Sequence, residues 1–219
     1  MNARLPAISP DASTTQAADA MTAVRFIDCT RLVPEPWANG GGVTRTLARG
    51  PEQGGAAAWR VSIATLDGPA KFSQFPGYDR TLLPIDDGMI DLRSQDGQLL
   101  ARAGQPVHFS GDLHVWVNLP ARPVNVLNVM CQRGAARARV SVAAHSLRVT
   151  PAATHLLVSL AGQWSLESAL LRGVTLAPLH AMWISGRPEE LALRPSGPGA
   201  QLASIAIDSL KADTQGQSR

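Results

Sequence analysis

Short apolar runs separated by turn signals make up most of the chain, and this pattern constrains the fold more than any other feature. WRVSIATL (59–66) alternates its side chains with period two and is rich in β-branched residues, and VNVLNVM (124–130) and QLASIAID (201–208) are similar runs. No stretch before Ala135 has the apolar spacing of an amphipathic helix. Repeated short strands of this kind predict an all-β barrel or sandwich.

An internal repeat extends this prediction to two similar units. LLPIDDGMIDL (82–92) aligns with LLVSLAGQWSL (156–166), and Ser110–Gly111 aligns with Ser185–Gly186 further along the chain. Repeated supersecondary units stack because neither can hide its apolar face alone. The sequence therefore predicts two β-barrels in tandem.

The same patterns suggest how the chain is divided. Residues 1–20 are dominated by Ala, Ser, Thr, Pro and Asp, so we expect a disordered leader there. Residues 21–135 are expected to form the N-terminal barrel and residues 136–210 the C-terminal barrel. The polar segment 211–219 is expected to be a disordered tail.

Composition and charge argue against several classes of function. Hydrophobic residues make up 45% of the chain and charged residues 17%, which is typical of a globular protein. The densest basic run, RGAARAR (133–139), lacks aromatic residues and a nucleic-acid motif, so we interpret it as a solvated turn. No apolar run approaches the roughly 18 residues of a membrane span. We therefore expect neither a nucleic acid nor a membrane as a partner.

The two cysteines bear on the compartment. Cys29 and Cys131 lie far apart among apolar residues and have no disulfide or metal spacing. Buried free thiols favour a reducing environment, so we expect a cytoplasmic protein.

The segment WANGGGVTRT (37–46) is the most unusual loop in the chain. A triple glycine loses much backbone entropy on folding and has no side chain to pack. It is expected where the backbone takes positive φ or lets another group approach closely. We therefore predict that this loop forms part of the functional site.

Polar residues around the irregular segments point to an anionic ligand. Arginines can hold a carboxylate with two hydrogen bonds, and free amides in a glycine loop can support an anion. Arg60 shares a strand face with Ser62 and Ala64, and this face is either solvent-exposed or turned into a barrel. In the alternative interpretation, Asp79, Arg80 and Asp112 pair with one another and brace loops. The polar candidates are Asn39, Thr44, Arg45, Arg60, Tyr78, Asp79, Arg80, Asp112 and Asn128.

Catalytic and metal-binding motifs are hard to find. The sequence has no His-x-His pair, nucleophile elbow, phosphate loop or CxxC. His108, Asp112 and His114 are the metal candidates, but edge or core histidines are the better interpretation. We expect neither a metal ion nor another cofactor.

At this point the motifs resemble a known family. WANGGGVTR (37–45), WRVSIA (59–64), DGPAKFSQFPGYDRTL (67–82), HFSGD (108–112) and LNVM (127–130) occur in the order and spacing typical of the HutD/Ves family. The resemblance is strong from Val24 to Arg133 and only general beyond. It implies a bicupin fold, with two tandem cupin-like barrels, and no usual cupin metal motif.

The resemblance also implies a function and a site. Such proteins are linked to bacterial histidine-utilisation operons, where they are thought to bind a small carboxylate such as urocanate or formylglutamate and to moderate the pathway without catalysis. Carried over by position, the ligand-binding residues are Trp37, Asn39, Gly40, Gly41, Gly42, Thr44, Arg60, Phe75, Arg80, Asp112 and Asn128.

Two positions depart from the family pattern. Thr46 and Val126 stand where the family usually has Glu and Asp, so two carboxylates are missing near the expected site. The arginines are retained, and an anionic metabolite remains the expected partner. A different ligand, or a different way of holding the usual one, is also compatible with these changes.

Three functional hypotheses remain open at this level. The first is a non-enzymatic sensor or regulator of histidine catabolism that binds a small carboxylate. The second is a cupin-type enzyme, either a metal-free isomerase or a metal-dependent oxygenase, and the third is a stress-associated interaction protein. The sequence leaves the ligand, the oligomeric state (including a homodimer) and the level of regulation open.

Overall fold

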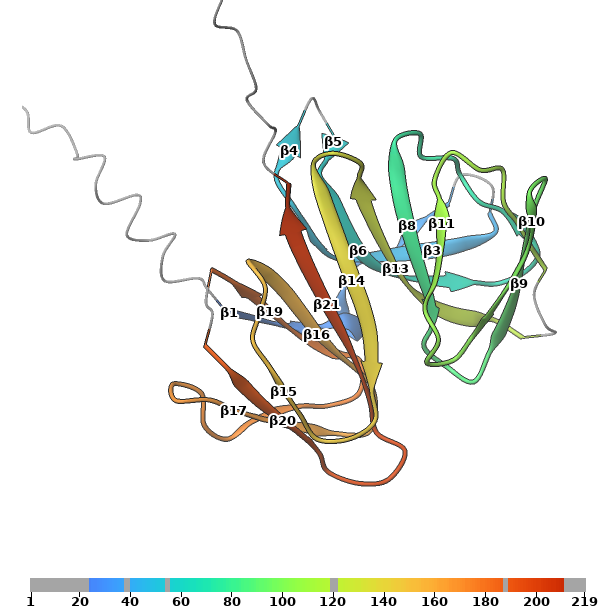
Figure 1. Ribbon diagram of the computed structural model, residues 1–219. Coiled ribbons are helices and arrows are strands. Elements are labelled where there is room, and N and C mark those ends of the chain that lie inside the picture. The colour runs from blue at the N-terminus through green and yellow to red at the C-terminus, as the bar shows by residue number, and fades with distance from the viewer. Residues whose placement is uncertain (1–23, 38–39, 54–55, 119–121, 187–188, 211–219) are drawn as a thin grey trace, which may run out of the picture.

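The computed structural model confirms that the protein is built from β-strands (Figure 1). It describes residues 24–37, 40–53, 56–118, 122–186 and 189–210. Within these segments the single helical element is one 3-10 turn, η1 (Cys29–Arg31). No helix in this part of the chain is long and apolar enough to cross a membrane. The expected leader (1–20) and tail (211–219) lie outside the described residues.

The first half of the chain forms a sandwich of two antiparallel sheets. We call the six-stranded one inner sheet 1 and the four-stranded one outer sheet 1. Inner sheet 1 has the order β11 (Val107–Ser110), β8 (Tyr78–Pro84), β13 (Val124–Gln132), β6 (Trp59–Leu66), β3 (Gly42–Arg49) and β2 (Glu35–Pro36). Outer sheet 1 has the order β10 (Gly97–Arg102), β9 (Met89–Ser94), β12 (Trp116–Asn118) and β7 (Ala70–Lys71). A separate hairpin joins β4 (Glu52–Gln53) to β5 (Ala56–Ala57).

The second half forms a sandwich of the same kind. Inner sheet 2 has the order β1 (Val24–Asp28), β19 (His180–Ser185), β16 (Thr154–Ala161), β21 (Gln201–Ser209) and β14 (Ala136–Ala143). Outer sheet 2 has the order β15 (Leu147–Val149), β20 (Leu191–Pro195), β17 (Trp164–Glu167) and β18 (Val174–Leu176).

The two sandwiches share one topology, as the sequence repeat predicted. The aligned segments 82–92 and 156–166 each run from an inner strand, β8 or β16, into an outer strand, β9 or β17. The order β11-β8-β13-β6 in inner sheet 1 corresponds to β19-β16-β21-β14 in inner sheet 2. The outer sheets correspond strand for strand as well.

The N-terminal strand crosses between the two halves. β1 pairs with β19 over five residues, from Val24 opposite Ile184 to Asp28 opposite His180. It therefore completes the sheet of the C-terminal sandwich, although it precedes every strand of the N-terminal one. The domain boundary expected between residues 135 and 136 stays a prediction. β1, which lies before this boundary in sequence, belongs to the sheet of the C-terminal sandwich.

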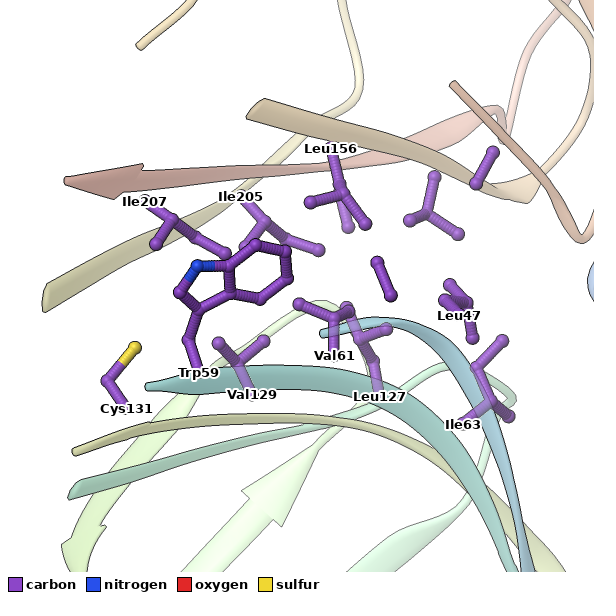
Figure 2. Close-up of a cluster of buried hydrophobic side chains, with 14 of the residues drawn as sticks. Leu47, Trp59, Val61, Ile63, Leu127, Val129, Cys131, Leu156, Ile205 and Ile207 are labelled. Carbon is purple, nitrogen blue, oxygen red and sulfur yellow. The ribbon is translucent and has the colours of Figure 1, made fainter. Parts of the chain in front are cut away.

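The inner sheets pack back to back, and this contact forms the central core of the molecule (Figure 2). Trp59, Val61 and Ile63 project from one face of β6, as their period-two spacing predicted. They meet Ile205 and Ile207 from β21 across the interface. Each aliphatic side chain buried this fully stabilises the fold by roughly 1.5–3 kcal/mol. Separating the two sandwiches would therefore cost much of the stability of the protein.

A buried histidine lies in the inner sheet of the C-terminal sandwich. The His155 side chain is 3% exposed; its Nδ1 accepts a hydrogen bond from the Ala152 amide at 3.2 Å. The ring proton is therefore on Nε2, which donates to Ser204 Oγ at 2.8 Å. Burial lowers the pKa of His155 from 6.5 to about 4, since the charged ring loses its solvation, and nearby Arg139 adds to the effect.

This histidine makes the stability of the protein sensitive to acid. Between about pH 6.5 and pH 4 the unfolded chain binds a proton at His155 that the folded protein does not. Stability is therefore lost as the pH falls through this window, by about 3 kcal/mol in all. Urea unfolding across the window should show that His155→Gln flattens the slope, whereas the exposed control His145→Gln keeps it. An unchanged slope in His155→Gln would contradict this assignment.

Candidate functional site

A cavity of about 290 Å³ opens in the N-terminal sandwich. Its walls come from β2, β3, β6, β8 and β13 and from the loop that follows β7. Successive side chains of the inner strands point to opposite faces of the sheet. Those that do not face the central core point into the sandwich and line the cavity. The lining residues are Glu35, Pro36, Trp37, Thr44, Arg60, Ala64, Phe72, Ser73, Phe75, Arg80, Leu82, Val126 and Asn128.

Arg80 is the most constrained polar group in this cavity. Its residue is only 7% exposed, yet its guanidinium makes only long hydrogen bonds. Nη1 lies 3.5 Å from the Ser73 carbonyl oxygen and Nη2 lies 3.4 Å from Asn128 Oδ1. The rings of Phe72 and Phe109 lie 4.9 and 5.1 Å from the guanidinium carbon.

The charge of Arg80 is incompletely compensated. Its Nε is buried without a hydrogen-bond partner, and no ion pair to Arg80 occurs among the described residues. Burial lowers its pKa to about 10, with a smaller contribution from the positive charge of Arg60. A buried cation of this kind needs an anion, because isolated charges are costly to remove from water.

Arg60 faces the same cavity, which settles the open question about its strand face. It projects from β6 into the sandwich, opposite to Trp59 and Val61. Its Nη2 lies 3.4 Å from Met130 Sδ, and its guanidinium carbon lies 5.7 Å from the centre of the Phe75 ring. Two arginines therefore line one small cavity. Among the described lining residues the one carboxylate is that of Glu35, at the exposed rim.

The glycine loop acts through the tryptophan that precedes it. The Gly40 amide donates to the Trp37 carbonyl (3.0 Å) and the Trp37 amide to the Gly42 carbonyl (2.9 Å), which closes a tight hairpin. Gly40 has φ +69°, and a Cβ on Gly42 would lie 2.4 Å from the Thr65 carbonyl oxygen. None of the three glycines is among the described residues that line the cavity. The Gly40 amide, which was expected to face a ligand, instead donates to the Trp37 carbonyl.

The hairpin fixes Trp37 as a wall of the cavity. Its indole Nε1 donates to Thr44 Oγ1 at 2.8 Å, and its ring packs edge-on against Phe72 at a centroid distance of 5.9 Å. The structure thus brings together most of the expected binding residues. Those that line the cavity are Trp37, Thr44, Arg60, Phe75, Arg80 and Asn128.

Asp112 lies elsewhere. Its carboxylate accepts from the Gly77 amide (2.8 Å) and Ser110 Oγ (2.8 Å) and pairs with Arg133. These contacts lower the pKa of Asp112, the Gly77 amide most of all. Arg133 also holds Asp79 at 3.0 Å. The two aspartates therefore brace loops, although through Arg133 and not through the expected pairing with Arg80. Asn39 lies outside the described residues.

Several lining residues escaped the sequence analysis. Phe72 and Ser73 belong to an irregular loop, and Glu35 to a short edge strand, so no periodic signal marked them. Leu82 could have been found from its spacing of two from Arg80 on β8. Of the two positions that depart from the expected family pattern, Val126 lines the cavity and Thr46 does not.

The three metal candidates do not converge. His108 Nδ1 lies 2.7 Å from Thr81 Oγ1, Asp112 pairs with Arg133, and the His114 ring lies against Trp116. No group of three or more His, Cys, Asp or Glu suited to a metal ion occurs within the described segments.

The fold and this cavity define a cupin-like protein. A cupin 2 conserved barrel domain protein from Leptotrichia buccalis superposes with a TM-score of 0.53 at 11% identity, covering 84% of this chain and 96% of that chain. This likeness shows the fold alone. The expected cupin-like architecture is thereby confirmed.

Closer comparisons give the family. The HutD family model matches residues 30–203, so the chain belongs to the HutD family. Protein Ves from Citrobacter koseri is 28% identical over 176 residues, which cover 80% of this chain and 90% of that protein. The structure of HutD from Pseudomonas fluorescens SBW25 superposes with a TM-score of 0.75 at 25% identity, covering 85% of this chain and 99% of that one.

The buried, uncompensated charge of Arg80 predicts an unusual effect on stability. Arg80→Met removes a desolvated cation and keeps an apolar side chain of similar length against the phenylalanines. We expect the ligand-free variant to gain about 1–3 kcal/mol in the free energy of unfolding, measured by urea titration near neutral pH. Arg133→Met, which breaks two exposed ion pairs, should give no gain. A loss of stability in Arg80→Met would contradict this assessment.

Proposed function

We propose that this protein binds a small carboxylate in the N-terminal cavity and acts as a non-enzymatic sensor or regulator of histidine catabolism. The observation that carries the proposal is the buried Arg80 guanidinium, which has an unpaired Nε and no ion-pair partner among the described residues. A carboxylate would supply the missing charge and hydrogen-bond acceptor together.

The surroundings of Arg80 support an organic anion with a flat body. Arg60 adds a second cation, and Asn128 offers an amide near Nη2 of Arg80. The rings of Trp37 and Phe75 form apolar walls that exclude water. The cavity of about 290 Å³ has room for a metabolite the size of urocanate or formylglutamate, since a water molecule occupies about 30 Å³.

The family supports the same ligand chemistry. The HutD relative from Pseudomonas fluorescens SBW25 was determined in a formate condition, and formate is the smallest carboxylate. Val126 leaves this wall of the cavity uncharged, which favours an anion beside the two arginines. That binding serves regulation and not catalysis is the part of the proposal that comes from the family resemblance.

Calorimetric titration tests the proposal. We expect urocanate, formylglutamate or another acid of the pathway to bind below the millimolar range. Arg60→Gln should weaken binding about 10- to 100-fold, because a hydrogen bond to a charged group contributes roughly 1.5–3 kcal/mol. Arg80→Met should abolish binding.

The matched control is Arg148→Gln, which lowers the net charge by the same amount as Arg60→Gln. Arg148 lies in the C-terminal sandwich and forms an exposed ion pair with Glu190. It should bind as the wild type does. The proposal fails if no acid of the pathway binds in this range, or if Arg60→Gln binds as well as Arg148→Gln.

A further inference from the structure

A second cavity, of about 580 Å³, lies where the two sandwiches diverge. The turn at residues 133–135 connects β13, in inner sheet 1, to β14, in inner sheet 2. Beyond this turn the two strands separate, and the cleft between them is bounded by β8, β11 and β13 on one side and by β14 on the other. We call it the inter-sandwich cleft.

The wall formed by β14 is a strand edge. β14 is eight residues long and is the last strand of inner sheet 2, paired with β21 on one side. Consecutive residues from Ala136 to Val140 line the cleft, as expected when a strand presents its edge and not one face. An edge of this length offers main-chain donors and acceptors to an added strand.

The internal repeat shows what this edge lacks. The strand that corresponds to β14 in the N-terminal sandwich is β6, which pairs with β13 on one side and with β3 on the other. Within the described residues no strand takes the place of β3 beside β14. The protein therefore fills this position in one sandwich and leaves it vacant in the other.

The cleft has an apolar floor and basic side chains above it. Val129, Ala138 and Val140 are among its apolar residues, and burial raises the pKa of Cys131 to about 12, which keeps the thiol neutral. Arg137 and Arg139 share the exposed face of β14. They belong to the basic run that the sequence suggested was only a solvated turn.

The remaining charges of the cleft leave it basic. On the opposite wall the acidic group is Asp79, which is already paired with Arg133. Arg139 forms an exposed pair with Asp208 at 3.0 Å, a type of pair worth little in water, and Arg137 forms no ion pair among the described residues. A second copy of this strand would place these arginines against one another, which is unfavourable.

We propose that the inter-sandwich cleft binds an extended acidic segment of another protein, which adds to the edge of β14 as a strand. Main-chain hydrogen bonds to β14 supply affinity in this mode, and alternate side chains supply specificity. Because Arg137 and Arg139 are two residues apart, the segment carries acidic residues at alternate positions. The residues between them are apolar and face Ala138 and Val140.

Fluorescence anisotropy with synthetic hexapeptides tests this proposal on the full chain. The probe carries Glu at alternate positions with Val between, and two controls replace Glu by Lys or methylate the central Val amides. We expect the Glu peptide to bind at least about tenfold more tightly than either control. Lys side chains would repel Arg137 and Arg139, and methylated amides cannot donate hydrogen bonds to β14. Equal binding of the methylated peptide would exclude strand addition.

Charge reversal provides the matched variant. The double variant Arg137→Glu and Arg139→Glu should lose the Glu peptide and gain the Lys peptide. The double variant Arg148→Gln and Arg194→Gln, at exposed pairs in the C-terminal sandwich, should bind as the wild type does. A similar loss in this control would show a bulk charge effect and overturn the proposal.

Two further results would overturn it. Citrate could displace the peptide at equal charge concentration, which would define a site for small anions. Sedimentation could show a dimer that the Arg137→Glu and Arg139→Glu variant abolishes, which would define a contact between copies of this chain. Thermal unfolding checks that each variant is folded, and Arg60→Gln, which alters the N-terminal cavity, should leave peptide binding unchanged.

Discussion

A buried guanidinium without a counter-charge is the constraint on which the site of this protein depends. Arg80 reaches the N-terminal cavity because β8 alternates, so that Thr81 and Leu83 face away from it while Arg80 and Leu82 face into it. The back-to-back packing of the inner sheets fixes the backbone of β8 and β13, and in this position the Arg80 residue is only 7% exposed. The fold thus keeps a charge where only an anion can satisfy it.

The two sandwiches have diverged from a shared plan. At the repeat position of Arg80 the C-terminal sandwich has Thr154, and its interior is filled by Trp164, Met182 and Leu193, all fully buried. It therefore serves as a packed support for its neighbour. Within the described residues, the C-terminal sandwich also has no strand beside β14 in the place that β3 takes beside β6.

The sequence predicted the strands and the tandem arrangement, because period-two alternation and the repeat are local signals. It left open whether the face of β6 that carries Arg60 is turned to solvent or into the sandwich. It could not predict that β1 crosses to the C-terminal sandwich, since strand pairing at long range leaves no local pattern. The glycine loop was interpreted as a ligand contact, whereas the Gly40 amide and the Gly42 carbonyl bond to the main chain of Trp37 and position its side chain. Asp112 was placed in the site because its neighbours belong to a family motif, yet Arg133, distant in sequence, holds it at the surface.

The side-chain NMR signal of Arg80 Nε–H tests the central claim most directly. It can be assigned from its absence in Arg80→Lys and followed as urocanate or formylglutamate is added. If the carboxylate completes the missing hydrogen bond, the Nε–H signal moves downfield and its exchange with solvent slows as the site saturates. A ligand that saturates the protein and shifts the Trp37 indole signal, while Arg80 Nε–H stays unchanged, would contradict the claim.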